Sequence, residues 1–162
     1  MNTRLAYLLG LLICAALLGF GLYLQHVDGL DPCPLCIFQR VAFIALGLVF
    51  LLGALHNPGK TGAIVYAVLG GVAAVTGAAI AARHVWLQSL PPDQVPACGP
   101  GLSYMLEQFT LMRMLEKVLA GSGECAEAGW RFLGLTIPGW SLLWFVLLGA
   151  FVILLAWRVR RG

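Results

Sequence analysis

Two of the five cysteines, Cys33 and Cys36, form a C-x-x-C pair, and a basic residue, Arg40, follows four positions later. Two thiols at this spacing can close a disulfide or clamp a metal ion. Pro34 suits the first turn of a helix, where its missing N–H costs no hydrogen bond. A helix N-terminus and a nearby Arg both stabilise a thiolate, so the stretch is suited to thiol chemistry.

Two plainer interpretations of this stretch stay open. The pair can be a structural disulfide, with Arg40 extending its charge to a membrane interface. A metal site is less favoured, because Cys98 and Cys125 are 27 residues apart and no His stands at zinc-finger spacing.

The remaining candidates are single residues. Cys14 lies inside a long apolar run, where a thiol stays protonated, so we expect it to be a packing residue. His84 follows the third apolar run, and it can be a plain interfacial residue or a donor to a ligand carbonyl.

The elements that must position these residues follow from composition. The chain has 162 residues, of which 60% are hydrophobic and 10% charged, and its mean hydropathy is +0.90. Soluble domains carry about 25% charged residues, so this composition indicates a membrane protein. The net charge of +3 comes from scattered or terminal basic residues, with no basic stripe, which argues against a nucleic-acid partner.

Four uncharged intervals of 23, 19, 22 and 26 residues divide the sequence. About 20 apolar residues form a helix that crosses a bilayer, and no interval alternates like a barrel strand. We predict an all-α membrane protein, a four-transmembrane-helix bundle that forms one domain over 1–162. The helices are expected at about 5–25, 35–55, 61–82 and 138–157. The first could be a signal peptide, but its length and the lack of an A-x-A site favour a retained helix.

The flanking charges predict the orientation. The basic residues on one side have no acid among them, whereas the other side is mixed in sign. The positive-inside rule then places both termini in the cytoplasm and the loops at about 26–34 and 83–137 in the periplasm. Cys33, Cys36, Cys98 and Cys125 would share that oxidising side, where disulfides persist.

The long periplasmic loop has two predicted parts. Its Pro- and Gly-rich stretch, 91–101, should be extended and mobile. The stretch 102–119 reads as a short amphipathic helix, which lies in the membrane interface or packs on the bundle. Glycines at 121 and 123 break this helix, and Cys125 follows on a flexible tether. In the third span, small residues at 73, 77 and 81 predict close helix packing.

The order of motifs carries a resemblance over nearly the whole chain. C-P-L-C-I-F-Q-R opens the second span, R-H closes the third, one loop cysteine follows a Pro-rich stretch, and E-C-A-E-x-x-W-R-F-L-G-L precedes the fourth. The chain resembles the disulfide bond formation protein B (DsbB) family of bacterial inner membranes.

That resemblance implies a protein-dithiol:quinone oxidoreductase, which reoxidises a DsbA-type periplasmic thiol oxidase and passes two electrons to a membrane quinone. Carried onto this sequence, Cys98 holds the oxidase in a mixed disulfide. Cys125 is released and attacks Cys33, which frees Cys36 as a thiolate.

The quinone contacts are implied in the same way. Ubiquinone or menaquinone would lie beside Cys36, where Arg40 stabilises the thiolate and the reduced quinone. His84 would be a further quinone contact. Two alternatives remain: a DsbI-type paralogue dedicated to one special oxidase, and a non-enzymatic membrane scaffold with two structural disulfides.

Overall fold

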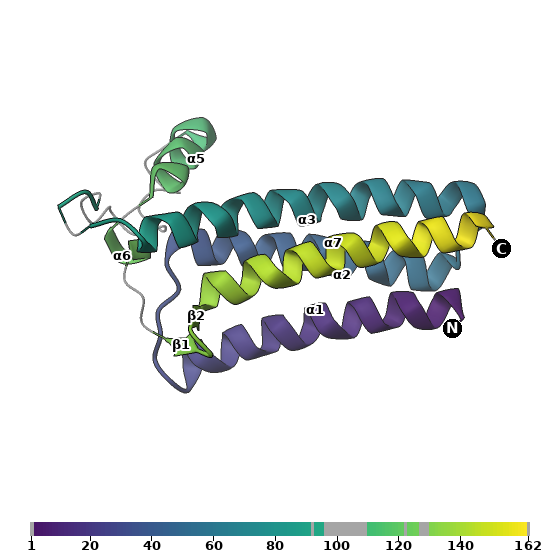
Figure 1. Ribbon diagram of the computed structural model, residues 1–162, viewed down its shortest axis with the longest axis horizontal. Helices are drawn as coiled ribbons and strands as arrows, with labels where there is room; N and C mark the ends of the chain where they lie inside the picture. The colour runs from purple at the N-terminus through teal and green to yellow at the C-terminus, as the bar shows by residue number, and fades with distance from the viewer. Residues whose placement is uncertain (1, 92, 96–109, 122, 127–129, 162) are drawn as a thin grey trace.

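A bundle of four long helices forms the body of the molecule in the computed structural model, which describes residues 2–91, 93–95, 110–121, 123–126 and 130–161 (Figure 1). Each helix is long and apolar enough to cross a membrane. The predicted all-α membrane bundle is therefore confirmed. The four helices are α1 (Thr3–His26), α2 (Pro34–His56), α3 (Lys60–Gln88) and α7 (Ile137–Arg161).

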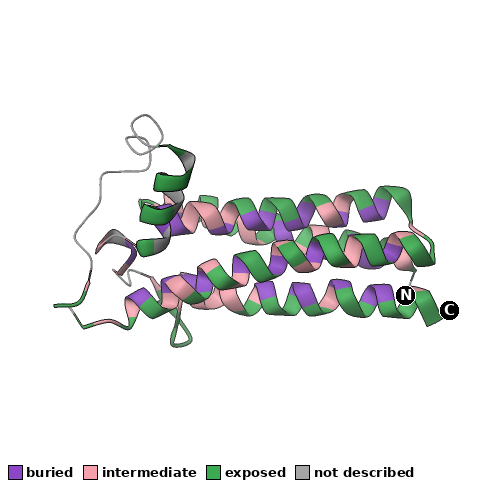
Figure 2. Ribbon diagram, turned by 90° about the horizontal axis from the view of Figure 1, so that it is seen from above, coloured by how far each residue is buried: buried purple, intermediate pink, exposed green. Residues whose placement is uncertain are grey.

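The outer faces of the helices suit lipid. Buried residues follow the inner faces, and exposed residues cover the outside of the bundle (Figure 2). Many of the exposed side chains are large and apolar, such as Val75 at 70%. A soluble protein rarely exposes so large an apolar surface, so this one is adapted to a hydrocarbon environment.

The third helix runs six residues past its predicted end at 82, so Arg83 and His84 lie inside it. The charge of Arg83 marked the predicted boundary. In the structure the guanidinium of Arg83 donates a hydrogen bond to the carbonyl of Ala120 at 3.1 Å. Its central carbon lies 4.1 Å from the centre of the Trp86 ring. A charged residue that finds such partners does not have to end a helix.

The packing of α3 depends on small residues, as predicted. Its buried positions include Gly70, Ala74, Gly77 and Ala81. A Cβ atom at Gly77 would overlap the ring of Phe145 on α7. Close approach of two helices through small residues is the usual route to tight packing in a membrane.

The Phe145 ring continues the contact to a third helix. It stacks on Phe43 of α2, with ring centres 3.9 Å apart and an interplanar angle of 14°. Two helices and the glycine of a third thus meet around one pair of aromatic rings, which lies inside the largest cluster of buried residues.

The smaller elements lie at one end of the bundle, and both termini lie at the other (Figure 1). The end that carries Cys33, Cys36 and Cys125 is called the cysteine end below. Beside it are α5 (Leu111–Ala120), α6 (Gly123–Ala126) and a hairpin of β1 (Arg131–Phe132) and β2 (Leu135–Thr136).

The structure describes only parts of the two segments predicted for the long loop. The predicted helix 102–119 is described only from 111 onwards, as α5. The Pro-rich stretch is described at 91 and 93–95, where Gln94 N–H donates to the carbonyl of Pro91, and Cys98 lies outside the described residues.

The glycine contact gives a stability test. Gly77→Ala should lower the free energy of unfolding in detergent by about 1–3 kcal/mol, because the added methyl group overlaps the Phe145 ring. Gly71→Ala, on the same helix with nothing within 4 Å of the new atom, is the matched control and should be neutral or slightly stabilising. Equal effects of the two changes would contradict the packing argument.

Candidate functional site

Cys33 and Cys36 lie at the start of α2, with their sulfurs 3.3 Å apart in hydrogen-bond contact. Cys33 is the residue that caps the helix, and its sulfur also accepts the backbone N–H of Cys36 at 3.4 Å. Pro34 occupies the first helical position. The sequence therefore places both thiols where the positive end of the helix dipole favours a thiolate.

His84 faces this pair from α3. Its Nε2 lies 3.7 Å from the Cys33 sulfur, and its Nδ1 lies 3.1 Å from Nε2 of Gln39. If the Gln39 amide donates to Nδ1, the imidazole proton must sit on Nε2, which faces Cys33. His84 can then donate to a Cys33 thiolate. It is buried, so it is not the plain interfacial residue that one interpretation of the sequence allowed.

Cys125 approaches from α6. Its sulfur, the Cys33 sulfur and a ring nitrogen of His84 all lie within 4.8 Å of one another. The prediction of a flexible tether here is wrong: Cys125 is in a short helix, is 1% exposed, and packs with Leu87 and other buried residues.

Contacts between distant segments, which spacing along the chain does not show, place Cys125 at this site. Gly121, at a φ of +88°, ends α5 next to α3, and a Cβ atom there would overlap the side chain of Leu87. The short helix α6 also contacts α3, so Cys125 lies among residues that are far away in the sequence.

The same three donors are a possible metal clamp. Two thiolates and one imidazole are ligands that zinc accepts. The sequence argument against a metal considered only spacing along the chain, whereas Cys33, His84 and Cys125 come together from three separate elements. The arrangement can therefore serve thiol exchange or metal binding as far as geometry is concerned.

Arg40 lies one helical turn after Cys36, but the hydrogen bonds that define its position go to α1. Its guanidinium donates to Oε1 of Gln25 at 2.6 Å and to the carbonyl of Gly21 at 2.9 Å. A guanidinium has five N–H donors, so these bonds leave others for a further acceptor. Arg40 joins α1 to α2 and also lines the cavity described next.

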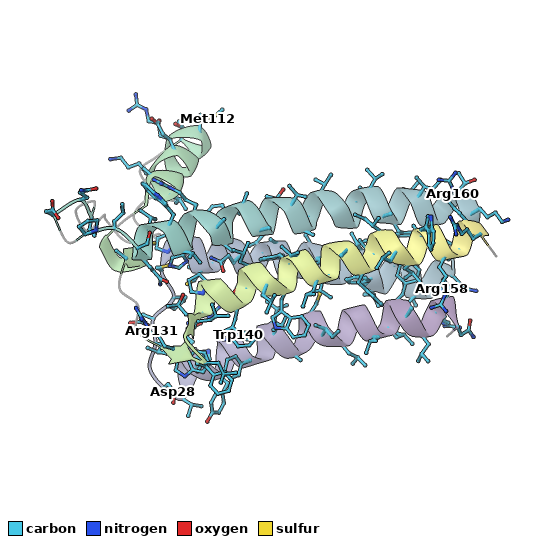
Figure 3. All side chains as sticks on the ribbon, in the orientation of Figure 1. Asp28, Met112, Arg131, Trp140, Arg158 and Arg160 are labelled. Atoms are coloured by element: carbon cyan, nitrogen blue, oxygen red, sulfur yellow. The ribbon has the colours of Figure 1, made fainter. Side chains whose placement is uncertain are left out.

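A cavity of about 980 Å³ opens at the cysteine end, between α1, α2, α7 and the hairpin. Its lining is largely apolar and aromatic, and Trp140, at this end in Figure 3, belongs to it. Oε1 of Gln88 is buried and has no hydrogen-bond partner among the described residues. The polar side chains in the lining include Cys33, Cys36, Gln39, Arg40, His84 and Gln88.

Three amides were missed as site residues by sequence reasoning. Gln25, Gln39 and Gln88 sit in or at the ends of apolar runs, and a polar residue at such a place is a signal of function or of buried pairing. Cys14 is buried in the middle of α1 within the main apolar core, as predicted.

Comparison with known proteins gives a consistent result. The family model "Disulfide bond formation protein DsbB" matches residues 3–155. Similar chains named "Disulfide bond formation protein B" include one from Hahella chejuensis, 58% identical over 90% of this chain and 88% of its own length. Others come from Nitrosococcus oceani, 54% identical (99% and 94% covered), and Methylococcus capsulatus, 51% identical (99% and 98% covered).

The buried amide–imidazole contact can be tested by a double-mutant cycle. Gln39→Leu should lower the free energy of unfolding by about 1–3 kcal/mol, because it leaves Nδ1 of buried His84 without its partner. The double variant Gln39→Leu, His84→Leu should lose less free energy of unfolding than the two single variants lose together. Strict additivity, measured by unfolding in detergent, would show that the contact contributes nothing.

Proposed function

We propose that this chain, which belongs to the disulfide bond formation protein B family, reoxidises a DsbA-type thiol oxidase and passes the two electrons to a membrane quinone. The observation that carries the proposal is the meeting of Cys33 and Cys125. Their sulfurs lie within 4.8 Å of each other, and Cys33 lines a cavity large enough for a ring-shaped ligand.

The thiol steps are exchanges in which one disulfide replaces another. The reduced oxidase attacks the Cys98–Cys125 disulfide and is held on Cys98, while Cys125 leaves as a thiolate. Cys125 attacks the Cys33 sulfur of the Cys33–Cys36 disulfide, so a Cys33–Cys125 bond forms and Cys36 leaves as a thiolate. The second thiolate of the oxidase then attacks its own mixed disulfide, which completes its oxidation and releases Cys98.

Resolution of the inter-loop bond returns the loops to their starting state. Cys98 attacks Cys125, which re-forms their disulfide and leaves Cys33 as a thiolate. The Cys33–Cys36 pair then holds the two electrons. His84 supports this step, since its Nε2 lies beside the Cys33 sulfur and can donate a hydrogen bond to the leaving thiolate.

The residues around the cavity fit a quinone. When bound, a quinone accepts two electrons and two protons, and it presents carbonyl oxygens that accept hydrogen bonds. Arg40 can donate to a quinone carbonyl from the cavity wall. The one N–H of neutral His84 faces Cys33, so His84 lines the cavity on the thiol side. The buried, unpartnered Oε1 of Gln88 can accept a hydrogen bond from a hydroxyl group of the reduced quinone. The apolar and aromatic lining suits the ring and its tail, as in other small-molecule sites.

The charge distribution supports the proposed orientation. Arg158 and Arg160 lie at the end that carries both termini (Figure 3), and Arg4 and Lys60 belong to helix starts at the same end. Short basic flanks favour the cytoplasm. The cysteine end would then face the periplasm, where a DsbA-type partner works.

A reconstituted assay tests the function. Purified protein in detergent should oxidise a reduced DsbA-type protein only when quinone is added. Cys36→Ser should abolish this turnover, because the Cys33–Cys36 pair is the proposed route for electrons into the quinone. Cys14→Ser is the matched control and should keep nearly full activity. Turnover that survives Cys36→Ser, or that needs no quinone, would overturn the proposal.

The role of Arg40 is open to a separate measurement. Arg40→Met should raise the quinone KM about tenfold to a hundredfold, because it removes a hydrogen bond from a charged donor and a bond of that strength changes affinity by this factor. Arg40→Lys should keep part of the activity as a point charge. Gln25→Leu, which removes one of the two hydrogen bonds of Arg40 to α1 and leaves the guanidinium in place, is the control. If it weakens quinone use as much as Arg40→Met, Arg40 acts as a tie between helices.

A further inference from the structure

We propose that the β1–β2 hairpin is a membrane anchor, with its tip inserted into the lipid–water interface on the cysteine side. The hairpin pairs Arg131 with Thr136 and Phe132 with Leu135, so its turn consists of Leu133 and Gly134 alone. Such a contact with lipid does not depend on the proposed redox reaction.

The turn has an unusual residue for its backbone. Leu133 and Gly134 both have positive φ, at +51° and +82°, as the two central residues of a type I′ turn require. Asn or Asp followed by Gly is the sequence that such turns prefer. Here a Leu holds the left-handed position and is 78% exposed, although it has no local reason to be there.

Apart from Arg131, the exposed surface of the hairpin is also apolar. Phe132 and Leu135 are both exposed. The ring of Trp130 stacks on the ring of Phe132, with ring centres 5.8 Å apart. The indole N–H of Trp140 donates to the carbonyl of Phe132 at 3.1 Å. Tryptophans that combine an apolar body with a satisfied N–H are typical of membrane interfaces.

This apolar surface is continuous with the lipid-facing surface of α1. The Trp130 ring meets the ring of Phe20 edge-on, with centres 5.6 Å apart. Phe20 and Tyr23 are exposed on the last turns of α1, which is one of the membrane-spanning helices. In Figure 1 the hairpin lies level with that end of α1, and in the view turned by 90° (Figure 2) a short exposed turn at this end projects sideways from the bundle.

The position indicates lipid as the occupant of this surface. A hairpin that pointed along the bundle axis would meet water or a soluble partner. This one projects across the axis at the height where the membrane helices end. Its exposed Arg131, at the cysteine end in Figure 3, is placed to contact lipid phosphates. Since Trp130 and Phe132 also line the cavity, the anchor would hold one wall of it in place.

The test is a depth measurement in vesicles of phosphatidylethanolamine and phosphatidylglycerol. A small fluorescent amino acid replaces Leu133, Val75 or Asp93 in otherwise unchanged protein. Val75 is the lipid-exposed reference in the middle of α3, and Asp93 is the exposed reference outside the helices. Lipids brominated near the head of the acyl chain should quench the probe at 133 strongly, and aqueous iodide should quench it weakly.

The opposite result would overturn the proposal. If iodide quenches the probe at 133 as strongly as the probe at 93, and brominated lipid does not, the tip lies in water. That outcome would leave a protein partner as the occupant.

A substitution that preserves the turn gives a second test. Leu133→Asn suits the left-handed position better than Leu, so it keeps the hairpin fold while it removes the apolar tip. In vesicles, backbone amides at 130–136 should exchange with deuterium faster than in the unchanged chain. Leu133→Phe, which stays apolar, should exchange like the unchanged chain. Equal exchange in all three would show that insertion of the tip does not hold the hairpin.

Discussion

Polar groups inside this bundle need partners, because no water in the hydrocarbon region can supply them. Two contacts meet that need. The Gln39–His84 pair joins α2 to α3, and the bonds of Arg40 to Gln25 and Gly21 join α2 to α1. Together they fix the first two turns of α2 against both neighbours. The geometry of the thiols at the head of that helix depends on this fixing, since Cys33 lies against the same imidazole.

The sequence was sufficient for the features that arise from local rules. Uncharged intervals gave the four helices to within a few residues, except at the end of α3, because one fixed length of hydrocarbon governs them all. Pro34 and the C-x-x-C gave the start of α2. The small residues of α3 predicted its close packing, although Ala74 and not Ala73 is the fully buried neighbour of Gly77.

The remaining features depend on contacts between distant segments. No rule along the chain brings Cys125 of α6 to Cys33, and nothing in the motif R-H shows that His84 turns inward toward Gln39. The hairpin was missed because Leu-Gly is a weak turn signal beside Asn-Gly. Cys125 is buried in a short helix and is not on a flexible tether. In thiol exchange it must therefore reach its target by a small local movement.

The stack of Phe43 on Phe145 has a consequence for how the two faces of the membrane are kept apart. Phe43 lines the cavity, and Leu46, Leu148 and Val152 fill the core farther toward the end that carries the termini. Among the described residues this section is packed with apolar side chains, so it offers protons no relay of polar groups next to the cavity. Under the proposed reaction, protons from the thiols would enter and leave on the cysteine side. The protein would then move electrons into the membrane without carrying charge across it, and it would not drain the energy stored in the membrane potential.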